Sequence, residues 1–292
     1  MPNVRANGID IEYDEFGKPD DPALLLIMGF TAQMIAWDER LCQQLAGRGF
    51  RVIRFDNRDV GLSSKIEGGP EPDVSAAMDG DTSSASYTID DMADDAAGLL
   101  DALGIGRAHI VGASMGGFIA QTFALRHPEK TLSLCSIMSS TGNPDVGQPS
   151  PEAMTALMTP PPQTRDEALE RSVAVSKIIG SPGFPFDENR IKERAGRAYD
   201  RMFYPAGNVR QMLAIASQPD RTEALGSVDV PALVIHGAAD PLVSPTGGEA
   251  TAKAIPGADL LIIEGMGHDL PEGAWPQVVE AIASNAAKAG AR

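Results

Sequence analysis

Ser114 lies at the centre of the sequence Gly112-Ala-Ser-Met-Gly116, between an apolar run typical of a strand and a run with helical pattern. A serine in this context, with glycine two positions away on each side, is typical of a nucleophile held on a sharp, strained turn. The flanking residues must be small because the turn brings two backbone segments close together. The Met115 N–H would face a developing oxyanion at a helix N-terminus, where the helix dipole favours negative charge. The pattern predicts acyl transfer through a serine nucleophile.

A nucleophilic serine requires a general base, and the base requires a group that orients it. His268 in Gly-Met-Gly-His follows the last predicted strand, and Asp240 in His-Gly-Ala-Ala-Asp follows the strand before it. The carboxyl ends of parallel strands lie at one edge of a sheet, where α/β proteins bind their ligands. We therefore expect Ser114, His268 and Asp240 to meet there.

Other histidines and acids compete for these roles. His236 ends a strand close to the predicted acid and is the rival base, although it would lie beside that acid rather than beyond the next strand. Asp145, after the preceding strand, is the alternative acid. His109 opens a strand far from the nucleophile and His127 ends a helix before a proline, so we interpret both as structural.

The second oxyanion donor is expected from the loop after the third strand. That loop reads Met28-Gly-Phe-Thr31, and the Phe30 N–H is the candidate. The alternative interpretation is a glycine turn that only ends a strand.

Several methionines fall near the predicted strand ends. Methionine most often fills gaps in a core, but a group of them can also make an adaptable apolar pocket. An aromatic content of 5% gives little support for carbohydrate stacking. We therefore expect a small-molecule, apolar ester as substrate, with these candidate pocket residues: Met28, Met34, Met138 and Met266.

Strand-like and helix-like runs alternate along most of the chain. Residues 9–16 alternate apolar and polar side chains after the turn dipeptide Asn7-Gly8, and apolar runs follow at 23–28, 50–56, 107–112, 132–140, 231–237 and 259–265. Helical patterns between these runs predict a mostly parallel α/β sheet with helices on both faces. Prolines and helical patches without a strand occupy residues 141–222. We interpret 1–140 and 223–292 as one discontinuous core and 141–222 as an inserted helical unit.

Residues 68–86 are rich in Gly, Pro, Ser and Asp and have few large apolar side chains. This composition indicates a mobile surface loop. Because it follows the carboxyl end of a strand, we also expect it to border the substrate entrance.

The composition of the 292 residues excludes several classes of protein. A net charge of −16 disfavours binding to nucleic acid or anionic membrane, and the longest apolar runs are too short to span a bilayer. No export signal is visible, and two cysteines without CxxC spacing indicate buried, reduced thiols, with a single bridge as the minor alternative. We expect a cytoplasmic protein that uses no metal and no cofactor, as a monomer or a homodimer.

The motifs resemble those of the α/β-hydrolase fold family. The resemblance rests on Ser114 in Gly-Ala-Ser-Met-Gly-Gly, Asp240 and His268 in that chain order, and Asp56-Asn-Arg-Asp-Val-Gly-Leu-Ser63, where Asp59 replaces a commoner glycine. With Leu-Leu-Ile-Met-Gly29, the chain is most similar to the aclacinomycin methylesterase type of bacterial esterase, which cleaves a carboxylic methyl ester on a polyketide. The resemblance implies an eight-stranded sheet, a helical cap after strand 6 and no cofactor.

The expected function is hydrolysis of a carboxylic ester through an acyl-enzyme. Dehalogenases and epoxide hydrolases of this fold use Asp where this chain has Ser114, which disfavours both. The alternatives are a C–C bond hydrolase, a cofactor-free perhydrolase, and a ligand-binding receptor that retains the three residues with little turnover.

Overall fold

Eight strands form a single sheet in the computed structural model, which describes residues 2–291. The sheet order is β1-β2-β4-β3-β5-β6-β7-β8, with β1 and β2 antiparallel to their neighbours and the remaining pairs parallel. The predicted mostly parallel, eight-stranded α/β sheet is confirmed. The strands are β1 Asn3–Ala6, β2 Ile9–Phe16, β3 Ala23–Ile27, β4 Arg51–Phe55, β5 Ala108–Ala113, β6 Thr131–Ile137, β7 Ala232–Gly237 and β8 Asp259–Ile263.

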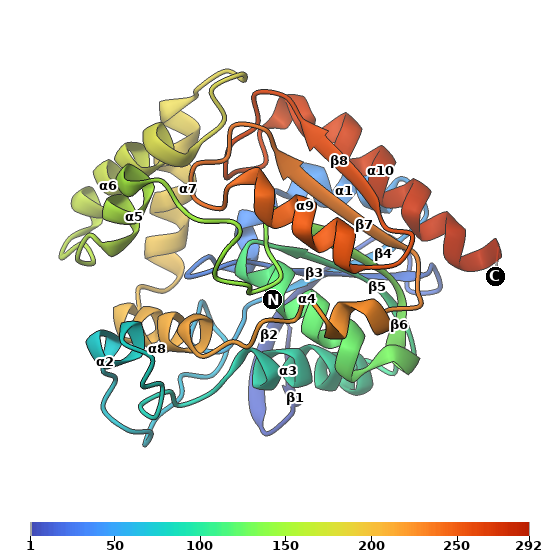
Figure 1. Ribbon diagram of the computed structural model, residues 1–292, viewed down its shortest axis with the longest axis horizontal. Coiled ribbons are helices and arrows are strands. Elements are labelled where there is room, and N and C mark those ends of the chain that lie inside the picture. The colour runs from blue at the N-terminus through green and yellow to red at the C-terminus, as the bar shows by residue number, and fades with distance from the viewer. Residues whose placement is uncertain (1, 292) are drawn as a thin grey trace.

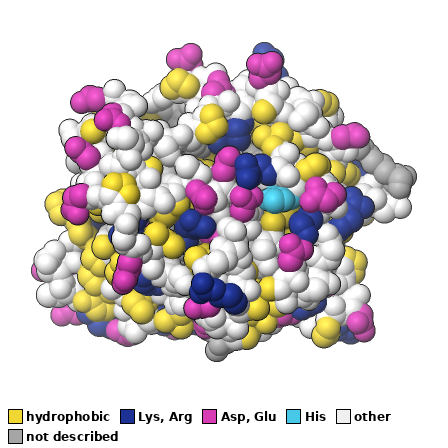
Figure 2. Space-filling view, turned by 90° about the horizontal axis from the view of Figure 1, so that it is seen from below, with side chains coloured by type: hydrophobic (Ala, Val, Ile, Leu, Met, Phe, Trp, Pro, Cys, Tyr) yellow, Lys and Arg dark blue, Asp and Glu magenta, His cyan; other side chains and the backbone are white. Residues whose placement is uncertain are grey.

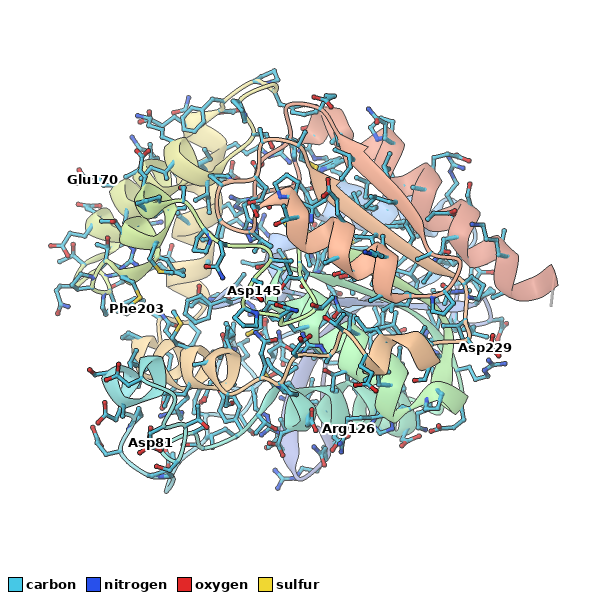
Figure 3. The ribbon with its side chains drawn as sticks, in the orientation of Figure 1. Asp81, Arg126, Asp145, Glu170, Phe203 and Asp229 are labelled. Carbon is cyan, nitrogen blue, oxygen red and sulfur yellow. The ribbon has the colours of Figure 1, made fainter. Side chains whose placement is uncertain are left out.

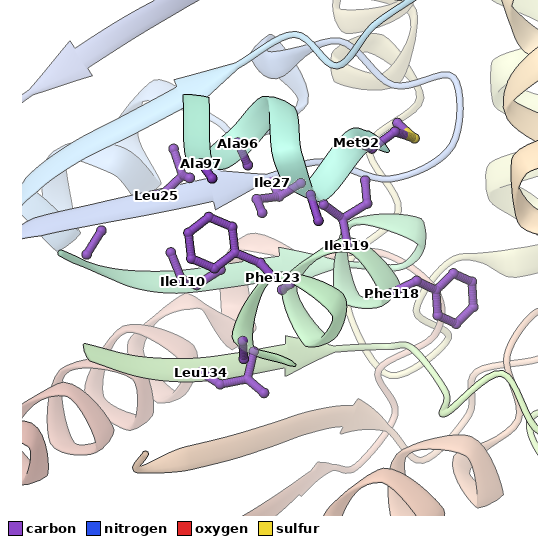
Figure 4. Packing of buried hydrophobic residues seen from close by; sticks show 14 of the residues in the cluster. Leu25, Ile27, Met92, Ala96, Ala97, Ile110, Phe118, Ile119, Phe123 and Leu134 are labelled. Atoms are coloured by element: carbon purple, nitrogen blue, oxygen red, sulfur yellow. The ribbon is translucent and has the colours of Figure 1, made fainter. Parts of the chain in front are cut away.

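Helices cover both faces of this sheet (Figure 1). The helices of the core are α1 Glu39–Ala46, α3 Ile89–Ala102, α4 Met115–Arg126, α9 Pro245–Ala254 and α10 Trp275–Ala287. Alternate side chains of a strand enter different cores because successive side chains point to opposite faces. Leu25 and Ile27 of β3 pack with α3 and α4, whereas Leu24 and Leu26 pack with α1 and α10. Figure 4 shows the first of these clusters, with Phe123 of α4 between the sheet and α3.

The start of α3 shows how sequence sets a helix boundary. The Thr88 side chain accepts a hydrogen bond from the Asp91 N–H, and the Asp91 carboxylate accepts one from the Thr88 N–H. This capping box satisfies two backbone donors that the first turn leaves free. Asp90 and Asp91 also place negative charge at the positive end of the helix dipole.

Four helices lie within residues 141–222: α5 Pro151–Met158, α6 Arg165–Ile179, α7 Glu188–Arg201 and α8 Pro205–Ala216. No strand is found there among the described residues. Helices α5, α6 and α7 stand at one end of the sheet, and α8 continues beneath them (Figure 1). We call this segment the cap; its boundaries at 141 and 222 stay a prediction.

The composition of residues 68–86 suggested an irregular loop throughout, but part of the segment is regular. It contains a short helix, α2 Val74–Met78, which begins where the Asp73 side chain accepts a hydrogen bond from the Ala76 N–H. Helix α2 lies against α8 of the cap (Figure 1). One local capping interaction and one neighbouring helix are enough to fix a turn of helix in a sequence without apolar periodicity.

Charged side chains of both signs are mixed on the surface. On the face seen in Figure 2, Lys and Arg side chains are interspersed with Asp and Glu rather than gathered in a basic patch. Within residues 2–291, no helix is long and apolar enough to cross a membrane.

Replacement of Gly116 by alanine should destabilise the fold, because a Cβ there would lie 2.2 Å from the Ile27 carbonyl oxygen. A backbone atom inside the sheet cannot move away cheaply, so we expect a loss of about 3 kcal/mol in the free energy of unfolding. Gly226→Ala is the matched control, since a Cβ there meets nothing within 4 Å. Urea unfolding of the two variants measures the difference, and equal stability would contradict the packing described.

Candidate active site

Ser114 occupies a strained turn between β5 and α4. Its φ is 57° and its ψ −122°, a region that side chains rarely adopt. The Ser114 N–H donates to the Ile137 carbonyl (2.9 Å), and its carbonyl accepts from the Gly117 N–H (2.8 Å). A Cβ on Gly112 would lie 1.9 Å from the Gly116 carbonyl oxygen, so the turn closes only with glycine there.

Ser114, His268 and Asp240 form a continuous hydrogen-bonded chain. His268 Nε2 lies 2.9 Å from Ser114 Oγ, and His268 Nδ1 lies 2.7 Å from Asp240 Oδ2. The other Asp240 oxygen accepts hydrogen bonds from the Leu242 and Val243 N–H groups, both at 2.9 Å. Because a carboxylate only accepts, Nδ1 donates to Asp240 and leaves Nε2 to accept the serine hydroxyl proton. The three residues predicted to meet are thus brought together.

The rival base lies on the other side of the acid. His236 is fully buried, its Nε2 donates to the Val243 carbonyl (2.8 Å), and it lies 3.6 Å from Asp240. Burial lowers the pKa of His236, which disfavours its charged form. No hydrogen bond joins His236 to Ser114 among the described residues. The alternative acid, Asp145, is exposed on a loop (Figure 3) and makes no contact with His268.

His109 and His127 have structural surroundings, as their sequence positions suggested. His109 Nδ1 lies 2.9 Å from Ser133 Oγ, and burial lowers the pKa of His109 to about 4. His127 Nε2 lies 2.8 Å from an Asp94 oxygen on the neighbouring helix.

Two backbone N–H groups beside Ser114 have no acceptor within the described part of the chain: those of Phe30 and Met115. Met115 is the first residue of α4, where N–H groups lack an intrahelical partner. Gly29, which precedes Phe30, packs so closely that a Cβ on it would lie 2.9 Å from the Ser114 Cβ. The free donors therefore flank the serine from two separate elements.

The four candidate pocket methionines are not gathered on an open surface. Met34 and Met266 are 0% exposed and Met138 is 3% exposed, whereas Met28 is half-buried. Met138 and Met266 pack with the α1 and α10 core, and Met28 borders it. Of the four, only Met28 retains appreciable surface, and a role of these methionines in the substrate pocket stays a prediction.

The cap also touches the site, which the sequence did not indicate. The His268 N–H donates to the carbonyl of Ile179, the last residue of α6 (2.6 Å), and the Gly267 N–H donates to Ser181 Oγ (2.9 Å). The loop that presents His268 is therefore held by residues that precede it by about ninety positions. Hydrogen bonds of this kind involve main-chain atoms and leave no pattern in a sequence.

Asp59, the departure from the usual glycine, has a specific place. It has a φ of 68°, which explains why glycine is common there, and its carboxylate binds Arg210 of α8 in two hydrogen bonds of 2.7 and 2.9 Å. The Ile66 N–H donates to the same carboxylate (2.8 Å). The unusual aspartate could be noticed in the sequence, but its partner in the cap, Arg210, could not be found from the sequence.

Cys42 and Cys135 are both buried and free. Burial raises the pKa of each thiol, that of Cys42 to about 12. Among residues 2–291, no group of three or more His, Cys, Asp or Glu side chains is arranged to hold a metal ion.

Comparison with known proteins agrees with this geometry. Residues 22–273 match the family described as the alpha/beta hydrolase fold. The chain belongs to the alpha/beta hydrolase fold family. It is 31% identical over 291 residues to a rhodomycin D methylesterase from a Streptomyces species (strain C5), covering 92% of each chain. It is also 30% identical over 272 residues to a 2-hydroxy-6-oxononadienedioate/2-hydroxy-6-oxononatrienedioate hydrolase from Burkholderia vietnamiensis, covering 91% of this chain and 88% of that one.

Among solved structures, this family member is similar to a thermophilic esterase from Thermogutta terrifontis. The TM-score is 0.71 at 25% identity, covering 99% of this chain and 98% of the other. The resemblance to this family and to bacterial methylesterases is therefore confirmed.

The buried His109 should make the hydrolase sensitive to acid. Its pKa of about 4 lies below the ordinary value of 6.5, so the unfolded chain binds more protons between these values and stability falls as pH falls. Between pH 7.5 and pH 5, this group lowers the free energy of unfolding by about 2 kcal/mol. Urea unfolding at pH 7.5 and 5.0 should show a smaller loss for His109→Gln, which can still bond to Ser133. An equal loss in both proteins would contradict this cause.

Proposed function

We propose that the protein is a serine hydrolase that cleaves a carboxylic ester through an acyl-enzyme intermediate. The observation that supports this best is the hydrogen-bonded chain from Ser114 Oγ through His268 to Asp240. In such a chain the histidine removes the serine proton while the buried carboxylate stabilises the resulting imidazolium. The relatives are consistent with it, since one of them is a methylesterase.

The mechanism follows from which atoms face one another. Ser114 Oγ attacks the ester carbonyl as its proton passes to His268 Nε2, and the carbonyl oxygen becomes an oxyanion. The Phe30 and Met115 N–H groups, which lack other acceptors, donate to that oxyanion. The intermediate then expels the alcohol, which takes the proton from His268. A water molecule, deprotonated by His268, releases the acid and regenerates Ser114.

The proposed substrate is a small-molecule ester, apolar on its acid side. The methylesterase relative acts on rhodomycin D, and a methyl ester of a polycyclic acid is the corresponding proposal here. Residues 141–222 would set this specificity as a cap over the core of 1–140 and 223–292. A cytoplasmic location, as a monomer or homodimer, completes the proposal.

The C–C bond hydrolase is the second candidate. The Burkholderia relative is named as the hydrolase of a compound with keto, hydroxyl and carboxylate groups but no ester, so a carbon–carbon bond is what remains for it to hydrolyse. Both reactions use a serine, a histidine and an oxyanion hole, so the two functions have to be separated by testing several classes of substrate. A C–C hydrolase would leave simple esters nearly untouched, a perhydrolase would show peroxide-dependent oxidation, and a receptor would label once with a fluorophosphonate without turnover.

Ser114→Ala should abolish hydrolysis of p-nitrophenyl acetate and butyrate. Without the nucleophile no acyl-enzyme can form, and we expect kcat/KM to fall at least about a thousandfold. Initial rates at 405 nm measure the loss, with circular dichroism as the control for folding. Unchanged hydrolysis by the variant would exclude the proposed mechanism.

The two histidines beside Asp240 should differ sharply when replaced. His268→Gln removes the proposed base and should lower kcat at least about a thousandfold. His236→Gln removes a buried ring that does not reach Ser114, so kcat should stay within about tenfold while stability falls. Steady-state kinetics of both variants, alongside urea unfolding, decide the assignment, and the reverse ranking would make His236 the base.

A further inference from the structure

The loop that bears the proposed oxyanion donor Phe30 has an unfavourable backbone conformation. Thr31, the next residue, has a φ of 60°, which is disfavoured for a β-branched side chain. The local hydrogen bond of this turn joins the Ala32 N–H to the Gly29 carbonyl at 3.3 Å, which is long. Since Thr31 is exposed, its own side chain does not hold the turn through burial. An interaction from outside the loop is needed to fix it.

A side chain of the cap supplies that interaction. The Thr31 N–H donates to Gln211 Oε1 (2.9 Å), and Gln211 Nε2 donates to the Arg58 carbonyl (3.0 Å). One end of the amide must accept and the other must donate, so its orientation is set by its partners. Gln211 is 0% exposed and lies within helix α8. A buried amide with both ends bonded is a rigid connection between two core loops.

The position of this connection decides what it can do. The peptide N–H of Thr31 and the peptide N–H of Phe30 are separated only by the backbone torsions of Phe30. On the other side, the Met28 carbonyl accepts from Asn57 Nδ2 (2.9 Å). The Phe30 N–H thus lies between two fixed peptide groups, one held by the core and one held by the cap.

We propose that Gln211 is a positioning residue for the oxyanion hole, which directs the Phe30 N–H toward the reacting oxygen through Thr31. The inference rests on the proposed function. It assigns to cap helix α8 a part in the chemical step, in addition to any part in substrate choice. Gln211 itself touches no substrate atom in this proposal.

The test compares Gln211→Met with Gln211→Glu in the full chain. Methionine has a similar volume but cannot bond to the Thr31 N–H, and we expect kcat to fall about tenfold to a hundredfold with little change in KM, less than the loss of a whole oxyanion donor. Glutamate keeps an acceptor for the Thr31 N–H, and at this fully buried position its neutral acid form also keeps a donor for the Arg58 carbonyl. It should therefore recover most of the rate. A trifluoromethyl ketone, which adds Ser114 Oγ to its carbonyl and places the resulting oxyanion in the hole, should bind Gln211→Met more weakly by the same factor as kcat falls.

Tyr204→Phe is the matched control. It removes the hydrogen bond between the Tyr204 hydroxyl and Arg210 Nη2 (2.9 Å) at the start of the same helix, without touching the oxyanion loop. We expect its kcat and its affinity for the ketone to equal those of the unmodified protein. Should Gln211→Met fail to fold, Gln211→Ala replaces it and must show the same selective loss of kcat.

Three results would overturn the inference alone. The first is a Ser114-dependent esterase whose kcat is unaffected by Gln211→Met, and the second is a loss in that variant that Gln211→Glu does not recover. A loss of kcat that leaves the affinity for the ketone unchanged would overturn it as well. By contrast, an unmodified protein without turnover of any ester overturns the proposed function itself. The two failures are therefore distinguishable.

Discussion

The turn at Ser114 is the constraint on which the rest of the structure depends. A serine at a φ of 57° is unfavourable by itself, and the close packing of the chain around it holds it in this conformation. Gly112 and Gly116 let β5 and α4 meet closely, and Gly29 lets the end of β3 lie against the serine. The position of β5 beside β3 in the sheet follows from the same contacts. The nucleophile is thus presented by the packing of backbone against backbone, which no single side-chain interaction could replace.

The sequence alone predicted the part of the fold that is governed by local pattern. Apolar runs and glycine stops located the central strands, and strand β2 matches its predicted span, Ile9–Phe16. Strand β1 was missed because four residues at a sheet edge, of which only Ala6 is buried, have no distinctive pattern. The three residues of the candidate site could be predicted from strand ends, but their supports from the cap could not.

The cap holds two loops of the core in place by hydrogen bonds. It holds the His268 loop through Ile179 and Ser181, and it holds the loop after β3 through Gln211. Any movement that lifts the cap away must break these hydrogen bonds. The geometry described for the site therefore belongs to the arrangement in which the cap is seated. Loops that are hydrogen-bonded from two sides in this way can place their functional groups precisely, even if the loop sequence alone would not be rigid.

Asp59 has a consequence for how such proteins diverge. Its backbone conformation suits glycine, yet its carboxylate neutralises Arg210, a largely buried cation of the cap. A relative with glycine at this position but with Arg210 would have a guanidinium without its counter-charge. A relative with Asp59 but without the arginine would have a buried, unpaired carboxylate at a strained turn. Each change by itself removes the counter-charge of a buried or largely buried group, so the two positions are expected to vary together across related sequences. The presence of both Asp59 and Arg210 would then distinguish this branch of the family from members that have the common glycine.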